Sequence, residues 1–208
     1  MFKKRVILIL VALAVMLCAI CPIKLDAYAA NEKWRYAYIS FLKKNSTHNE
    51  YSGRVYNRFH LAFIDGDPVP ELILARGNGH SVCAEVYTYA DGGVKQIGSF
   101  GQNGNFTYAT KRGRIISYYG GMGCFYHYFY KVSNHKCSRY ARYEFEYEQG
   151  VSRTYRINRT RVTQAEYRQR LNAEKAKYNY RAGGYRRGVA ATTSNINKIL
   201  NNCSAVIR

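Results

Sequence analysis

The chain has 208 residues, and its 32 lysines and arginines against 13 aspartates and glutamates give a formal net charge of +19. This length limits the protein to about one domain with a single core. The charge does not determine a fold, but it favours anionic partners such as teichoic acid, nucleic acid or acidic glycans. A basic surface without a dedicated ligand is the alternative, because charge alone selects no partner.

The N-terminal segment, residues 1–29, has the features of a secretory signal peptide. Basic residues at positions 3–5 precede an apolar run over 6–20, and small residues for cleavage occur within 27–29. The apolar run is about fifteen residues, short of the roughly 20 that span a bilayer, so export is favoured over a membrane anchor. We therefore expect a secreted, cell-wall-associated protein without a stable transmembrane segment after processing, and one α+β domain over residues 30–208.

Four cysteines remain in that domain: Cys83, Cys124, Cys137 and Cys203. Because disulfides form and persist outside the cell, an even number predicts one or two disulfide bonds. Four cysteines allow three connectivities, and the sequence does not choose among them.

The first predicted element is a helix over residues 30–45. Trp34, Tyr38, Phe41 and Leu42 form one apolar stripe at helical spacing on an otherwise polar segment. The helix is expected to pack on the core through this stripe.

Residues 54–157 predict an antiparallel sheet. Apolar and polar residues alternate with period two from Arg54 to Phe63, and further strand-like segments follow with turn residues between them. Short connections place consecutive strands side by side, so a curved antiparallel meander is expected. The later segments are Glu71–Arg76, Ser81–Ala90, Val94–Phe100, Phe106–Thr110, Arg114–Tyr119, Cys124–Val132, Cys137–Tyr147 and Arg153–Ile157.

Helical character returns over residues 163–202. A capping box that begins with Thr163 starts a helix reaching about Tyr178, and Thr193 or Ser194 caps a short last helix after a loop rich in glycine and arginine. An N-terminal helix, a long antiparallel sheet and two C-terminal helices indicate the α+β class.

Three stretches of the chain resemble a known family. They are FHLAFIDGDPVPELILARGNGH, VYTYADGGVKQIGSFG and IISYYGGMGCFYHYFYKV, with a weaker echo in YRINRTRVTQAEYRQRL. The pattern from Phe59 to Val132 is similar to that of uncharacterised secreted or lipoprotein-like proteins of clostridia-type Gram-positive bacteria. The resemblance implies location and architecture but no activity, and this chain lacks the longer acidic run that the family tends to carry after the first strand.

The acidic turn FIDGDPVPEL is one candidate site. Asp65 and Asp67 can converge and Glu71 can add a further oxygen, which suggests calcium as the one cofactor to test. The alternative is a tight turn in which the aspartates bond their own backbone amides and Gly66 supplies a positive φ.

A second candidate combines an HxxC with a CxxH. His80, Cys83, Cys124 and His127 are a plausible tetrahedral zinc set, although residues three apart on one strand face opposite sides. The same residues also fit a disulfide with nearby histidines, or a catalytic cysteine and histidine pair in a small pocket.

A third candidate is the arginine-rich region after the sheet. Arginine forks bind phosphate or carboxylate, whereas tyrosines on neighbouring strands are as typical of a sheet core as of a stacking surface. The predicted anion-binding residues are Arg153, Arg156, Arg159, Arg161, Arg168, Arg170, Arg186 and Arg187.

These features together predict an exported, non-enzymatic binding module for anionic polymers at the bacterial cell surface. The alternative is a secreted hydrolase or metal-dependent enzyme that uses Asp65, Asp67, His80 and His127, although no Gly-x-Ser-x-Gly, HExxH or phosphate-loop motif is present. A structural surface protein, held in the anionic wall by its charge, is the third interpretation.

Overall fold

A computed structural model describes residues 32–45, 57–77, 79–80, 82–147 and 153–208 of the chain. The predicted signal peptide and the first residues of the predicted strand at Arg54 lie outside these residues. None of the helices in the described ranges combines the length and apolar composition needed to cross a bilayer.

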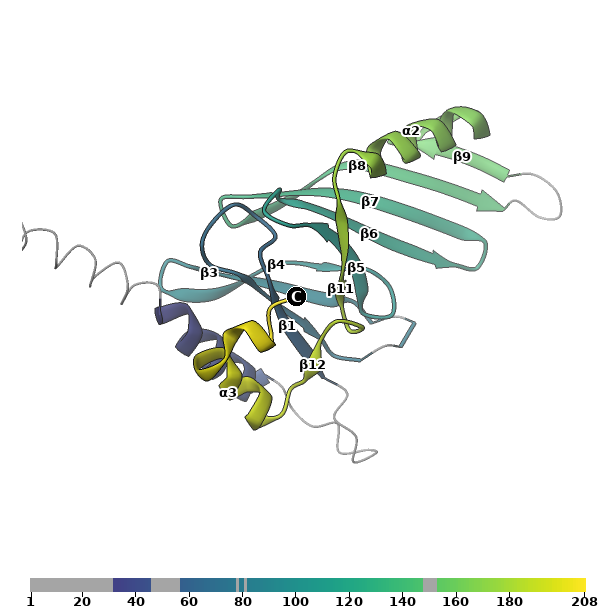
Figure 1. The fold of residues 1–208 in the computed structure, drawn as a ribbon. Helices are drawn as coiled ribbons and strands as arrows, with labels where there is room; N and C mark the ends of the chain where they lie inside the picture. The colour runs from purple at the N-terminus through teal and green to yellow at the C-terminus, as the bar shows by residue number, and fades with distance from the viewer. Residues whose placement is uncertain (1–31, 46–56, 78, 81, 148–152) are drawn as a thin grey trace, which may run out of the picture.

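Two antiparallel sheets form the centre of the molecule (Figure 1). The five-stranded sheet has the order β12-β1-β2-β3-β4 and the seven-stranded sheet has the order β10-β9-β8-β7-β6-β5-β11. The first contains β1 (Arg58–Ala62), β2 (Glu71–Ala75), β3 (Ala84–Ala90), β4 (Gly93–Phe100) and β12 (Val189–Ala190). The second contains β5 (Asn105–Ala109), β6 (Arg114–Gly121), β7 (Cys124–Ser133), β8 (Lys136–Tyr147), β9 (Arg153–Ile157), β10 (Thr160–Val162) and β11 (Tyr180–Gly184).

Helices α2 and α3 both begin at a threonine whose side chain caps the helix. The N-terminal helix covers residues 32–45, α2 covers Gln164–Ala176 and α3 covers Thr193–Asn201, followed by the short 3₁₀ helix η1 (Cys203–Ala205). Thr163 accepts the Glu166 N–H, as the capping box predicts. The cap of α3 is Thr192 and not the predicted Thr193 or Ser194.

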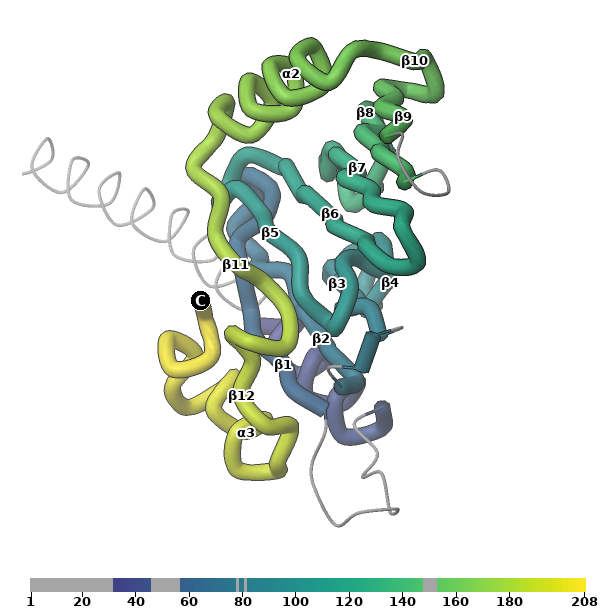
Figure 2. The backbone as a smooth tube through the Cα atoms, turned by 90° about the vertical axis from the view of Figure 1, so that its right-hand side faces the viewer, coloured from purple at the N-terminus to yellow at the C-terminus, as the bar shows by residue number. Residues whose placement is uncertain are grey.

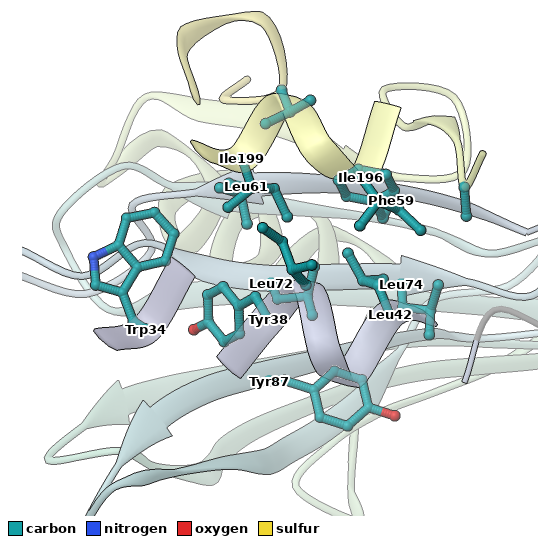
Figure 3. Close-up of a cluster of buried hydrophobic side chains, with 13 residues drawn as sticks. Trp34, Tyr38, Leu42, Phe59, Leu61, Leu72, Leu74, Tyr87, Ile196 and Ile199 are labelled. Carbon is teal, nitrogen blue, oxygen red and sulfur yellow. The ribbon is translucent and has the colours of Figure 1, made fainter. Parts of the chain in front are cut away.

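One face of the five-stranded sheet is covered by helices (Figure 3). Tyr38 and Leu42 of the N-terminal helix meet Phe59 and Leu61 of β1, and Ile199 of α3 completes this cluster. The apolar stripe of the first helix therefore packs as its spacing predicts.

The other face of that sheet packs against the seven-stranded sheet. Ile73, Phe100, Tyr108 and Ile115 belong to this second core, in which both sheets take part. β1 is consequently buried on both faces, and His60 has no exposed surface although the alternation of apolar and polar residues along this strand is typical of a half-buried strand.

Helix α2 covers part of the opposite face of the seven-stranded sheet. Tyr167 and Leu171 of α2 pack on Phe129, Tyr143 and other side chains of β6 to β9. Figure 2 shows α2 leading into β11, which runs beside β5.

The α+β class, the antiparallel pairing, the N-terminal helix and the two C-terminal helices are confirmed. The single meander is wrong, because β4 and β5 are consecutive but belong to different sheets. The segment 163–202 is also not wholly helical. It contributes β11, which pairs with β5, and β12, which pairs with β1.

Candidate functional site

The acidic turn between β1 and β2 is built from its own hydrogen bonds. The Asp67 N–H donates to Asp65 Oδ1 at 3.0 Å, and the Val69 N–H donates to Asp67 Oδ1 at 2.8 Å. These are the aspartate turns that the sequence offered as the alternative to a calcium site. Gly66 does not have a positive φ, so that detail of the prediction is wrong.

Glu71, a predicted metal ligand, does not belong to the group of possible ligand atoms that contains Asp65 and Asp67. It is fully buried in β2, and its Oε2 accepts the Ile64 N–H at 2.8 Å. Burial and then the nearby charge of Asp65 raise the pKa of Glu71 to about 8. The side chain is therefore neutral at pH 7 and belongs to the core rather than to an ion site.

His135, and not Glu71, is the third possible metal ligand beside Asp65 and Asp67. Ligand atoms of Asp65, Asp67 and His135 lie within 4.8 Å of one another, the only such group of three among the described residues. His135 reaches this position because Asn134 and His135 both have positive φ, the conformation of a tight hairpin turn. The histidine was missed because the β7–β8 turn is distant in sequence from the acidic turn.

This cluster opens into a cavity of about 460 Å³ whose wall is basic. Lys111, Arg112, Arg114 and Lys131 line the cavity together with the two aspartates. Calcium takes six to eight oxygen ligands, whereas each aspartate here already uses one oxygen in the turn. The residues present therefore fit calcium poorly, and calcium binding stays a prediction.

The histidine and cysteine pairs do not assemble into a zinc site. Cys124 and His127 lie three residues apart on β7 and point to opposite faces of the sheet. The Cys83 sulfur contacts the Tyr119 hydroxyl, and the side-chain amide of Gln102 lies 2.7 Å from His80 Nε2. No four-residue ligand set forms among the described residues.

The predicted disulfides are absent, because all four cysteines of the described residues are free thiols. Cys203 packs against the helix-covered core of the five-stranded sheet, whereas Cys137 packs against the core between the sheets. Burial raises the pKa of Cys137 to about 11, so this thiol behaves as a small apolar side chain.

The residues of the alternative hydrolase lie in different places. Asp65 and Asp67 line the basic cavity, whereas His127 lines a separate cavity beside α2. His80 lines neither of them and is hydrogen-bonded to Gln102. These side chains therefore do not form one active site.

The eight predicted arginines divide into several groups. Arg153 and Arg161 share one shallow pocket, whereas Arg186 lines the cavity beside α2. Arg156 pairs with Glu146 at 2.8 Å, and Arg170 pairs with Glu166 at 2.8 Å. The remaining residues, Arg159, Arg168 and Arg187, are exposed.

Arg159 belongs to a pocket that the sequence did not indicate. The pocket holds about 180 Å³ and is lined by Arg139, Arg142 and Arg159. The β9–β10 turn is fixed to β8 because the Arg142 N–H donates to Asn158 Oδ1 at 2.8 Å and the Asn158 N–H donates to the Arg142 carbonyl. The segment SRYAR in β8 was the available signal for this pocket.

Next to that pocket, tyrosines and arginines stack on the face of β7 and β8 that α2 does not cover. The rings of Tyr126 and Tyr128 are parallel within 2°, with centroids 5.8 Å apart. The Arg142 guanidinium lies 5.2 Å and 5.9 Å from their centroids, and Arg139 lies 5.1 Å from that of Tyr128. We call Tyr126, Tyr128, Arg139, Arg142 and Arg159 the tyrosine–arginine face.

Comparison with known protein families, with curated proteins and with solved structures finds no match to this chain. The resemblance to secreted clostridial proteins therefore stays a prediction.

Proposed function

We propose that the protein is an exported binding module for anionic polymers, such as teichoic acid, nucleic acid or acidic glycans, at a bacterial cell surface. The observation that supports this proposal best is the tyrosine–arginine face. Parallel tyrosine rings offer stacking surfaces for bases or sugars, and the neighbouring guanidinium groups offer planar donors for phosphate or carboxylate.

The charge balance of the fold supports the same proposal. Every described acidic side chain except Asp65, Asp67 and Glu71 lies in an ion pair with a lysine or arginine. Basic residues greatly outnumber acidic ones, so most positive charges have no acidic partner within the described fold. Such a surface attracts polyanions and binds them with a strong dependence on salt.

The backbone conformation of Arg159 also supports the proposal. Its φ is 73°, a region in which residues with a Cβ are disfavoured, and Asn158 before it is also at positive φ. Glycine would suit this turn position better, so an arginine there is held at a cost in stability. Strain of this kind is common at functional positions, and here it places a third guanidinium beside Arg139 and Arg142.

The test compares binding of single-stranded DNA and of purified teichoic acid over a range of salt concentrations. We expect the double variant Arg139→Gln/Arg159→Gln to bind less tightly and to lower the slope of log K against log salt by about 0.7 for each lost phosphate contact. Arg142 is left in place because it pairs with Glu144, whose carboxylate is buried. Without Arg142 this carboxylate would be a buried charge with no counter-charge, which would destabilise the fold.

The matched control is Lys33→Gln/Lys44→Gln, which removes the same charge from exposed positions on the N-terminal helix. It should bind nearly as well as the wild type. The proposal is wrong if neither polymer binds at low salt, or if binding does not weaken as salt rises. Equal losses in the two double variants would show that net charge, and not the tyrosine–arginine face, determines binding.

A further inference from the structure

A cavity of about 500 Å³ lies between the seven-stranded sheet and the chain that connects α2 to β11. Its position follows from the register of the strands. Ala182 of β11 is opposite Thr107 of β5, which is opposite Ile116 of β6, so these three side chains share one face of the sheet. Two of them are small, and they leave open space on a face that elsewhere carries aromatic rings.

The cavity carries positive charge without any acidic side chain in its wall. Lys175 of α2 and Arg186 after β11 both line it. Lys175 Nζ lies 3.1 Å from Nε2 of His127, which projects from β7. No aspartate or glutamate forms an ion pair with Lys175 or Arg186 among the described residues.

The hydrogen bond between His127 and Lys175 has a defined direction at neutral pH. Burial and then the charge of Lys175 lower the pKa of His127 to about 4, so the imidazole is neutral and its Nε2 accepts a hydrogen bond from the ammonium group of Lys175. Lys175 as a whole residue remains exposed, but desolvation of its ammonium group lowers its pKa. A partly desolvated cation that lacks a counter-charge is stabilised when an anion binds to it.

The walls of the same cavity are aromatic. Tyr118 has 41 % of its surface exposed, and its ring lies 5.1 Å from the His127 ring, centroid to centroid. Tyr178 forms another wall and is itself covered by the Arg114 guanidinium at 5.4 Å. Binding sites for small molecules typically combine such apolar and aromatic walls with a few polar groups that fix orientation.

We propose that this cavity binds a single sugar ring that carries one carboxylate or phosphate group. Lys175, oriented by His127, binds the anionic group, and Tyr118 packs against the ring. The site is independent of the tyrosine–arginine face, because His127 points to the opposite side of β7 from Tyr126 and Tyr128. Sugar binding at this cavity and polymer binding at the tyrosine–arginine face are therefore independent of each other.

Calorimetric titration and ligand-observed NMR with D-glucuronate, glucose 6-phosphate, glucose and inorganic phosphate test this proposal at physiological salt. We expect saturable binding of at least one charged sugar, and much weaker binding of glucose and of phosphate alone. Lys175→Met should weaken binding at least about tenfold, because a hydrogen bond to a charged group is lost. Tyr118→Ala should weaken it while leaving the charge unchanged.

Lys44→Met is the matched control, because Lys44 is exposed on the N-terminal helix, does not line the cavity and forms no ion pair among the described residues. It should bind the charged sugar like the wild type, and circular dichroism should confirm that all variants are folded. The proposal is overturned if neither charged sugar binds, if glucose binds as tightly as glucuronate, or if Lys44→Met weakens binding as much as Lys175→Met.

Discussion

Replacing Glu71 by glutamine should remove a pH dependence of stability that the buried carboxyl group creates. Burial and the charge of Asp65 raise the pKa of Glu71 from 4.5 to about 8. The folded state therefore holds a proton that the unfolded chain releases above pH 4.5, and the free energy of unfolding falls as the pH rises from about 4.5 to about 8. The carboxyl group thus favours folding least at the alkaline end of this range.

The difference in stability between the wild type and Glu71→Gln isolates this effect between pH 6.5 and 8. The pKa of His60 and of His127 is lowered to about 4 in the folded state, so both still affect stability near pH 6.5, but they do so equally in the two proteins. One proton held in the folded state changes the free energy of unfolding by about 1.4 kcal/mol per pH unit, and Glu71 is half ionised near pH 8, so it should lower the free energy of unfolding by about 1.5 kcal/mol over this interval. Glu71→Gln keeps the size and an acceptor for the Ile64 N–H but binds no such proton.

Urea unfolding followed by the fluorescence of Trp34 measures the difference. The stability of the wild type relative to that of Glu71→Gln should fall by about 1.5 kcal/mol between pH 6.5 and 8. Asp91→Asn is the control, because Asp91 is exposed, Lys95 lowers its pKa, and it is ionised in both states over this interval. The reasoning is refuted if the stability of the wild type relative to Glu71→Gln stays constant or rises with pH, since Glu71 would then be ionised in the fold.

Three further predictions concern single residues. Arg159→Gly should relieve the positive φ and raise the melting temperature by a few degrees while it weakens polymer binding, and an unchanged melting temperature contradicts the strain. Gly101→Ala should destabilise the fold severely, because its Cβ would lie 1.6 Å from the Asn105 carbonyl oxygen, and near-wild-type thermal unfolding would contradict this. Cys137 should react with a thiol reagent only after unfolding, since burial raises its pKa to about 11, and fast labelling of the folded protein contradicts that assignment.

The positions of most strands could be predicted from local patterns. Alternating aromatic and aliphatic residues separated by glycine and asparagine turns identify β2 to β9 within a few residues. β11 could not be found in this way, because Tyr180–Gly184 has the composition of a loop and becomes a strand by pairing with β5, far away in sequence. The division into two sheets could not be predicted either. Asn103 and Gly104 mark the turn between β4 and β5, but no local pattern specifies that β5 pairs with β6 and β11 instead of β4.

The candidate sites were predictable only where their residues are close in sequence. Asp65 and Asp67 were found together, but their partner His135 comes from another hairpin. The regular alternation of sides along β8, which a strand pattern assumes, is also broken at Tyr140. A β-bulge leaves Tyr140 unpaired beside Phe129, and its hydroxyl donates to Glu174 of α2.

The open surfaces of the molecule follow from a mismatch between the seven-stranded sheet and the elements that cover it. Seven strands at about 4.8 Å spacing form a sheet roughly 30 Å wide. Helix α2 has 13 residues and is about 20 Å long, so it covers one face only in part. The cavity beside Lys175 lies where this cover ends.

On the opposite face, the five-stranded sheet packs on β5, β6 and the end of β7 through Tyr108, Ile115 and Val132. It does not extend to Tyr126 and Tyr128, which lie further along β7 and stack with arginines instead of core residues. Both proposed binding sites therefore lie on parts of the seven-stranded sheet that neither α2 nor the five-stranded sheet covers. A longer α2 would close the sugar site and leave the tyrosine–arginine face open, so the two functions can be lost separately.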